Sequence, residues 1–313
     1  MTAFVVVNPR SAGGRTRVEW KSISRTLNDF FPHFVCAFTR RRGDATNLVR
    51  NALSDGHQEV IAIGGDGTIN EAANGFFDDT GNRISPDAVL GFISSGTGGD
   101  FRKTFRIAPG PEASLTHLRS AKIRPVDVGR VSCLGADGSP TVRYFINIAS
   151  FGLSGVIVDA VNRARIAKFF GGTFAFAFHS VVSMTTYRPR AVRLILDNGF
   201  DGTVLVSTVA IANGQYFGGG MRVAPGALPD DGLFDVVIMG ASSKVASLAG
   251  LNQIYAGEHL ANPTVQVVRA RRVVAAPLAQ TRARHVFIET DGESAGTLPA
   301  TFEILPKALN LRC

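Results

Sequence analysis

The sequence predicts two domains, an α/β domain followed by a mostly β domain. In roughly the first 127 residues, short apolar strands alternate with helical segments, a pattern typical of a parallel sheet covered on both faces. After that point, strands rich in Val and Ile are punctuated by turn signals such as Asp137-Gly138, as in antiparallel sheets. The chain has 313 residues, which at about 150 residues per domain also suggests two domains. No Pro/Ser-rich linker separates them, so we expect them to pack closely.

The first domain is expected to alternate strands and helices. The segment 45–54 follows Asp44, a plausible helix N-cap, and ends at Asp55-Gly56. The segments 60–63 and 89–93 are apolar throughout, so both faces of these strands should be buried. The other expected elements are strands over 4–7 and 34–39 and helices over 18–30 and 69–77.

The second domain is expected to be built mainly from strands, with two helices among them. The expected strands cover 127–131, 141–148, 191–197, 203–213, 233–239, 265–270 and 285–290. The expected helices lie near 154–183 and 244–255. The alternation of strands and turns favours antiparallel sheets in this part of the chain.

The charge balance is positive. Lys and Arg number 33 against 25 Asp and Glu, so the formal net charge is 33 − 25 = +8, and the pI is about 9.9. With 45% hydrophobic and 19% charged residues, the chain is neither disordered nor an acidic solvating protein. The excess fits nucleic acid, an anionic membrane or a phosphate-rich substrate. The short clusters Arg40–Arg42 and Arg269, Arg271 and Arg272 accompany no recognised nucleic-acid motif, so a solvated basic face explains them.

The cysteines and the apolar segments bear on the compartment. Cys36, Cys133 and Cys313 are far apart and form neither a disulfide framework nor a zinc pattern. The N-terminus does not have the pattern of a signal peptide. The charge-free segment Phe169–Tyr187 is long enough to span a membrane but only moderately apolar, so we favour a helix inside the protein, near an apolar ligand. We therefore expect a cytoplasmic protein.

Three glycine-rich turns follow apolar strands of the first domain. They cover 8–14, 64–71 and 94–101. Without Cβ atoms the backbone can turn sharply and direct successive N–H groups at one anion, and the next helix adds the positive end of its dipole. Loops at the C-terminal ends of parallel strands are where ligands bind in open α/β sheets. Together the turns predict a site for the phosphates of a nucleotide.

Neither GxGxxG nor GxxxxGK[ST] is present, so the site is not one of these common phosphate loops. Asp66, in the second turn, would repel a phosphate. It either binds a metal or a ribose, or it caps the helix that starts near Thr68, and the spacing alone does not decide between these roles.

Two acidic segments lie in the second domain. The segment 227–233 carries Asp230 and Asp231 before a glycine, which is either an ordinary turn or a set of oxygen ligands for a hard cation. The segment 290–293 carries Asp291 and Glu293, which mark either a hairpin tip or a carboxylate pair for acid–base chemistry.

The motifs form an ordered set that resembles a known family. VVVNPRSAGG, TRRRGDA, IAIGGDGTINEAANGF and SGTGGDF follow one another, and ANGQYFGGGMRVAPGALPDDGLFDV and TDGE come later. The set resembles the diacylglycerol kinase catalytic domain, which is shared by soluble bacterial lipid kinases and by sphingosine and ceramide kinases. The resemblance covers nearly the whole chain. GGDGTINE is the specific motif, since GGDG alone also resembles NAD kinases and phosphofructokinases.

The resemblance implies an ATP-dependent kinase that phosphorylates a lipid hydroxyl, most simply that of diacylglycerol. It implies a Rossmann-like α/β nucleotide domain over 1–127, to which 297–313 return. It also implies a β-sandwich domain over 128–296, with the active site in the cleft between the two domains. The Phe-rich segment 169–178 would then line an acyl-chain pocket, or it is simply a core helix.

The resemblance also assigns roles to individual residues. Asp291 and Glu293 would be the catalytic acid pair, one of them the base. Asp231 and the carbonyl groups of Leu228 and Leu233 would hold a structural Mg²⁺, joined through water by Asp100 and Asp127. The nucleotide contacts would be Asn8, Pro9, Arg10, Ser11, Ala12, Thr39, Gly65, Asp66, Gly67, Thr68, Ile69, Asn70, Glu71 and Thr97. One position departs from the family, because Gly99 stands where many relatives have Asn.

Several alternatives stay open. The acceptor could be another lipid (a sphingoid base, ceramide or phosphatidylglycerol) or a soluble molecule such as NAD or a sugar. A protein that binds nucleotide or lipid without catalysis is disfavoured by the intact motifs, and a nucleic-acid-binding role ranks last. The expected partners are a lipid at a membrane surface, contacted through the basic surface, and a second copy of the chain as a homodimer.

Overall fold

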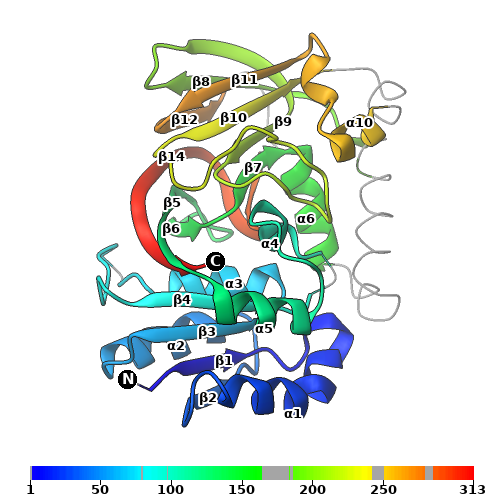
Figure 1. The fold of residues 1–313 in the computed structure, drawn as a ribbon. Helices are drawn as coiled ribbons and strands as arrows, with labels where there is room; N and C mark the ends of the chain where they lie inside the picture. The colour runs from blue at the N-terminus through cyan, green and yellow to red at the C-terminus, as the bar shows by residue number, and fades with distance from the viewer. Residues whose placement is uncertain are drawn as a thin grey trace. The chain divides into compact units, whose positions relative to one another are not determined.

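The computed structural model describes residues 2–78, 80–96, 98–163, 183, 186–241, 250–278 and 285–313 (Figure 1). The chain divides into two compact units, Met1–Asp127 with Lys307–Cys313, and Val128–Pro306. Residues 297–306 belong to the second unit, whereas the resemblance implied a return to the first domain from residue 297. The reason is their pairing, because Thr297 lies opposite Phe287 and Thr301 opposite Val274, both in the second unit.

The first unit contains a parallel sheet. Its strands are β1 (Phe4–Val7), β2 (Val35–Phe38), β3 (Glu59–Gly64), β4 (Val89–Ser94) and the end of β14 (Glu293–Arg312). Their order is β14-β4-β3-β1-β2, and neighbouring strands are parallel. The predicted parallel sheet is confirmed. The apolar runs form it because both of its faces are buried.

Helices cover both faces of this sheet (Figure 1). One core cluster joins α1 and α5 to one face, and it contains Val5, Val7, Ile61, Ile63, Ile23, Leu27 and Leu118. The intervening strand residues Val6 and Ala62 are equally buried and face the other side, where α2 contacts β1 and α3 contacts β3. The helices are α1 (Arg15–Asn28), α2 (Asp44–Ser54), α3 (Asp66–Asn74), α4 (Asp100–Thr104) and α5 (Pro111–Ser120), with a 3-10 turn, η1, at Ser11–Gly14.

The second unit is built from antiparallel strands. They are β5 (Ile123–Leu134, which begins in the first unit), β6 (Pro140–Phe145), β7 (Ile148–Gly152), β8 (Arg190–Leu196), β9 (Asp201–Ala212), β10 (Phe234–Gly240), β11 (Val265–Ala270), β12 (Arg272–Pro277), β13 (Phe287–Thr290) and most of β14. Six of them pair in a closed ring, β9-β7-β13-β14-β12-β8 and back to β9. The long strands β9 and β14 thereby close the sandwich predicted for this domain.

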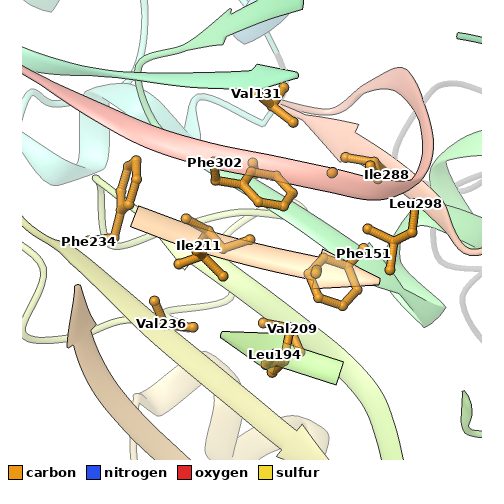
Figure 2. Close-up of a cluster of buried hydrophobic side chains, with 14 of the residues drawn as sticks. Val131, Phe151, Leu194, Val209, Ile211, Phe234, Val236, Ile288, Leu298 and Phe302 are labelled. Atoms are coloured by element: carbon orange, nitrogen blue, oxygen red, sulfur yellow. The ribbon is translucent and has the colours of Figure 1, made fainter. Parts of the chain in front are cut away.

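Aromatic and branched side chains fill the interior of the second unit (Figure 2). Phe151 and Phe302 stack with ring centroids 6.1 Å apart, and Phe145 and Phe234 stack at 5.6 Å. All four side chains are fully buried. Because they come from β7, β14, β6 and β10, their packing joins strands that are far apart in the chain.

The described part of the second unit also contains short helices. They are α6 (Leu153–Arg163), α10 (Leu251–Ala256) and the 3-10 helix η2 (His259–Ala261). Helix α6 lies directly on β13, since a Cβ atom at Gly155 would fall 2.1 Å from the carbonyl oxygen of Phe287. Only glycine allows this close approach. The predicted helices over 154–183 and 244–255, and the proposed acyl-chain segment 169–178, lie largely or wholly outside the described residues.

Replacing Phe302 with Ala should destabilise the second unit by about 3–5 kcal/mol, because the substitution removes a fully buried ring and leaves a cavity. Unfolding in urea, followed by the loss of antiparallel β signal in circular dichroism, would measure the loss. Val142 on β6 is 45% exposed, so Val142→Ala is the control and should change the free energy of unfolding by no more than about 0.5 kcal/mol. Equal losses in the two variants would contradict the assigned core.

The protein should lose stability below about pH 6.5 through His259. This ring is buried, its Nε2–H donates to the carbonyl oxygen of Val223 (3.0 Å), and burial lowers its pKa. The unfolded chain therefore binds more protons between the lowered pKa and about 6.5, so the free energy of unfolding decreases as the pH is lowered through that window. Melting temperatures at pH 5.5 and 7.5 should differ less in His259→Gln than in the wild type. An unchanged difference would assign the effect to other groups.

Candidate active site

The first glycine-rich turn is fixed by its own side chains. Asn8 accepts the N–H of Arg10 (3.0 Å) and donates through its side-chain nitrogen to the hydroxyl of Thr68 (3.0 Å). The Ser11 hydroxyl donates to the carbonyl oxygen of Asn8 (2.8 Å). Ala12, Gly13 and Gly14 all have positive φ, so the chain reverses sharply before α1 begins. The turn is therefore pre-formed, and Asn8 joins it to the second loop.

A cluster of three hydroxyl groups joins the first turn to the third. Thr16 lies 2.6 Å from Ser11 and 2.8 Å from Ser95, and Ser11 lies 3.1 Å from Ser95, measured between hydroxyl oxygens. Thr16 is fully buried and Ser95 nearly so. Sequence reasoning missed Thr16, because a threonine among the arginines of α1 gives no signal of its own.

The second and third turns pack backbone to backbone. A Cβ atom on Gly96 would lie 2.7 Å from the Cα of Gly65, and one on Gly64 would lie 2.5 Å from the side chain of Thr68. Real Cβ atoms do not come so close, so glycine is required at both positions. The three turns predicted to cradle phosphates are thus brought together at the C-terminal ends of β1, β3 and β4, which are neighbours in the sheet.

Asp66 caps a helix, but not the one expected. Its carboxylate accepts the N–H groups of Asp100 (3.0 Å) and Phe101 (3.1 Å), so it caps α4, and α3 already begins at Asp66 itself. The residue is partly exposed, yet burial of its carboxyl group raises its pKa, and the neighbouring Asp100 carboxylate raises it further. Of the two roles left open for Asp66, capping of a helix near Thr68 is not observed, and a ligand role stays a prediction. Asp66 joins the second loop to the third.

Gly99, the position that departs from the family, is the N-cap residue just before α4. It has φ +59, the left-handed region that glycine adopts without strain and Asn tolerates better than most residues. This conformation accounts for the exchange of one residue type for the other. A Cβ atom here would lie 2.5 Å from the Arg102 side chain, a flexible group.

Glu71 supports the loop that follows β2. Its two carboxylate oxygens accept the N–H groups of Gly43 (2.8 Å) and Ala45 (3.2 Å), at the start of α2. Asp44, expected as the N-cap of this helix, instead accepts the N–H groups of Arg40 (2.8 Å) and Arg41 (3.1 Å). Glu71 therefore holds together two segments of the predicted nucleotide site, and its contact with a nucleotide stays a prediction.

The other residues predicted to contact nucleotide lie on the same elements. Thr39 is buried at the end of β2, and its N–H donates to the carbonyl oxygen of Val7 (2.9 Å). Ile69 and Asn70 are buried in α3, so Ile69 could meet a nucleotide only through its backbone. Arg10 is exposed on the first turn. Pro9 and Gly67 are partly exposed, on the first turn and in α3, and Thr97 lies outside the described residues.

The predicted catalytic pair lies at a hairpin tip, which was one of the two interpretations of this segment, and its acid–base role stays a prediction. Asp291 (φ 49) and Gly292 (φ 84) form a two-residue turn of type I′ between β13 and β14. The Asp291 carboxylate accepts three backbone N–H groups, those of Ile146 (2.9 Å), Asn147 (3.1 Å) and Ile148 (2.8 Å). Glu293 is half-buried and opens β14. A third carboxylate, Glu289, lies beside them and was not predicted.

The aspartates predicted to hold Mg²⁺ each have another partner. Asp231 accepts the N–H of Leu233 (3.0 Å) and the guanidinium of Arg269, which also lies 3.3 Å from Asp235. Burial raises the pKa of Asp235. In the first unit, Asp100 pairs with Lys103 (2.9 Å), and Asp127 accepts the N–H of Lys307 (2.7 Å). In the second unit, Leu228 is exposed and precedes the turn that carries Asp231.

The donor chemistry at Asp231 fits Mg²⁺, because carboxylate and carbonyl oxygens are its preferred ligands. A cation there would share the Asp231 carboxylate with Arg269. Among the described residues, no group of three or more His, Cys, Asp or Glu side chains is arranged to hold a metal. The metal ligands therefore stay predictions.

Two family models match the chain. Residues 2–131 match the diacylglycerol kinase catalytic domain, and residues 147–313 match the YegS C-terminal NAD kinase beta sandwich-like domain. The chain belongs to the diacylglycerol kinase family. The resemblance found in the ordered motifs is thus confirmed, together with the two-domain fold class and the class of enzyme, a lipid kinase.

Curated relatives and solved structures agree with this assignment. A diacylglycerol kinase of Mycobacterium tuberculosis is 25% identical over 86% of this chain and 81% of its own length. A diacylglycerol kinase of Bacillus subtilis is 29% identical, over 83% and 79%. A probable lipid kinase of Chromohalobacter salexigens is 32% identical, over 66% and 62%. The crystal structure of a diacylglycerol kinase from Bacillus anthracis has the same fold, with a TM-score of 0.70 at 20% identity, covering 99% of this chain and 96% of that one.

Within the part of the lipid kinase that the structure describes, no helix is long and apolar enough to cross a bilayer. Most of the charge-free segment 169–187 lies outside this part.

Gly96→Ala should weaken ATP binding at least about tenfold, equivalent to about 1.4 kcal/mol, because the new Cβ would push the third turn away from Gly65. Titration with ATP, followed by calorimetry, would measure the change. Gly202→Ala is the matched control, since a Cβ there meets the ring of Phe200 at an ordinary 3.4 Å. Unchanged ATP affinity in a folded Gly96→Ala variant would show that these turns do not bind the nucleotide.

Proposed function

We propose that this lipid kinase transfers the γ-phosphate of ATP to the hydroxyl group of diacylglycerol and so produces phosphatidic acid. One observation carries the proposal. Two carboxylates, Asp291 and Glu293, lie on a turn whose conformation is held by backbone hydrogen bonds, in a chain whose first unit matches a diacylglycerol kinase catalytic domain. The names of the curated relatives support diacylglycerol as the acceptor.

The three glycine-rich turns would bind the phosphates of ATP. The backbone of the second and third turns approaches closely at Gly65 and Gly96, and N–H groups of such turns can bind an anion. Helices α1 and α3 begin at two of these turns and direct the positive ends of their dipoles there. Asn8 and Thr68 are joined by a hydrogen bond between their side chains. They would orient the nucleotide from the first and second turns.

The carboxylate pair would handle the proton. One of the two accepts the proton of the lipid hydroxyl as the oxygen forms a bond to the γ-phosphorus, and the bond from that phosphorus to ADP breaks. Asp291 is turned toward three backbone N–H groups and is fixed in place. We propose that it sets the geometry and that the half-buried Glu293 takes the proton.

Mg²⁺ would be held by Asp231 and the carbonyl oxygens of Leu228 and Leu233. When bound, such an ion supplies positive charge that stabilises its carboxylate and carbonyl ligands. The lipid remains in a membrane, so we further propose that the protein works in the cytoplasm and docks transiently on the inner face of the membrane. The net charge of +8 supports docking on anionic lipid, which would weaken as salt is raised.

The test is to incubate the protein with ATP, Mg²⁺ and a total lipid extract and to identify by mass spectrometry which lipid gains a phosphate. Diacylglycerol should be converted, and Glu293→Gln should lower the rate about 100-fold or more, because loss of a general base typically costs that much. Asp137, an exposed aspartate on another Asp-Gly turn of the second unit, provides the control, and Asp137→Asn should leave the rate unchanged.

The other outcomes identify the alternatives. Phosphate on ceramide, a sphingoid base or phosphatidylglycerol, with diacylglycerol untouched, would replace the proposed substrate. Phosphorylation of NAD in the absence of lipid would make the protein a kinase of soluble acceptors. Tight ATP binding without turnover on any acceptor would overturn the proposal as a whole.

A further inference from the structure

Glu289 is a carboxylate buried directly beneath the turn that carries Asp291 and Glu293. It lies on β13 and is only 3% exposed. Its neighbour Ile288 points into the hydrophobic core, so Glu289 points to the opposite face of the strand. In the register of the sheet it stands opposite Ser150 of β7 and Ser294 of β14.

The Glu289 carboxylate reaches the turn itself. One oxygen accepts the N–H of Gly292 (2.8 Å), and the other accepts the hydroxyl of Ser150. That hydroxyl is in turn hydrogen-bonded to the hydroxyl of Ser154 (2.7 Å), in the first turn of α6. Ser150 is fully buried and Ser154 nearly so. A continuous chain of hydrogen bonds therefore runs from the start of α6 to the tip of the hairpin.

The burial of this group calls for an explanation. A buried carboxylate costs free energy unless hydrogen bonds compensate, and an apolar residue at the same position would avoid that cost. Ser150 and Gly292 supply such compensation here, and one of these donors belongs to the turn with the predicted catalytic pair. Packing alone therefore does not account for a glutamate at residue 289.

The strand opposite Glu289 is irregular next to the turn. Ile288 pairs with Gly296 and Glu289 with Ser294, so the extra residue of this β-bulge, Ala295, lies on β14. Bulges occur beside active sites, where they change the direction of a side chain. Two residues after Glu289, Asp291 has φ 49, a conformation that a non-glycine residue keeps only when its surroundings hold it.

Two sets of bonds provide this support. The N–H groups of Ile146, Asn147 and Ile148 hold the carboxylate of Asp291, and the carboxylate of Glu289 holds the N–H of Gly292. The turn is thus fixed by hydrogen bonds to the side chain of Asp291 and to the backbone N–H of Gly292. Glu293 follows immediately, so its direction depends on the same two anchors.

We propose that Glu289 is a positioning residue for phosphoryl transfer. Its carboxylate holds the Asp291–Gly292 turn in the left-handed conformation that places the catalytic pair against the lipid hydroxyl. This inference rests on the proposed function. It adds a third carboxylate, which acts through the turn and touches neither ATP nor lipid.

The test compares Glu289→Ala, Glu289→Gln and Ser150→Ala with the wild type. Glu289→Ala removes the acceptor of the Gly292 N–H, and kcat should fall about 10- to 100-fold with little change in the KM for ATP, because small misplacements of catalytic groups cost this much. Glu289→Gln keeps an oxygen for Gly292 and should stay within about threefold of the wild type, whereas Ser150→Ala should fall between the two. Rates are measured well below each melting temperature. The control is Glu303→Gln, which should leave kcat unchanged. Glu303 is a half-exposed residue of β14 that pairs with Arg272 of β12.

A second readout does not depend on activity. Amide hydrogen exchange across 287–296, followed by mass spectrometry, should be faster in Glu289→Ala than in the wild type and unchanged in Glu303→Gln. If the alanine variant does not fold, Ser150→Ala and Glu289→Gln carry the test. A wild-type kcat in folded Glu289→Ala, or in Ser150→Ala with unchanged exchange, would overturn the inference. A wild-type protein that phosphorylates no lipid would instead refute the proposed function, and the exchange data would still report whether Glu289 holds the turn.

Discussion

Backbone N–H groups at loop ends and helix starts need acceptors, and in this protein acidic side chains of the motifs supply them. Asp66 serves the start of α4, Glu71 the start of α2, and Asp291 the residues that lead into β7. A buried N–H without an acceptor costs about as much as a lost hydrogen bond, so each of these carboxylates holds a loop in one conformation. The site geometry depends on this type of bond more than on ion pairs.

This arrangement explains how a predicted phosphate site tolerates acidic residues. An ionised carboxylate near ATP would repel it if its oxygens faced the nucleotide. The oxygens of Asp66 and Glu71 are instead directed at amide groups of the protein, which contribute positive partial charge. Gly65, next to Asp66, stays partly exposed where the second and third turns meet. These two residues hold the loops in place, and their contact with a nucleotide stays a prediction.

Much of the fold could be predicted from the sequence, because apolar runs such as 60–63 and 89–93 permit few structures other than buried parallel strands. The strand order of the second unit could not, since it depends on pairings between distant segments such as β8 with β12. Asp66 caps α4, 34 residues away, and no local pattern reveals such a contact. Thr16 and Glu289 were missed for the same reason, because their partners, Ser95 and Ser150, are remote in sequence. Asp291 and Glu293 could be assigned as the candidate catalytic pair only because the resemblance supplied what spacing alone left open.

The closed ring of six strands in the second unit has a mechanical consequence. In an open sheet, one strand can slide past its neighbour and leave the rest in place. In a ring, a slip of β14 past β13 must be matched by slips at β12, β8, β9 and β7 before the circuit closes again. Substitutions in the outer loops therefore cannot easily change the register position of Glu293 at the start of β14. The closed ring therefore fixes the register of its strands. Residues on its surface can change during evolution while Glu293 keeps its position in the sheet.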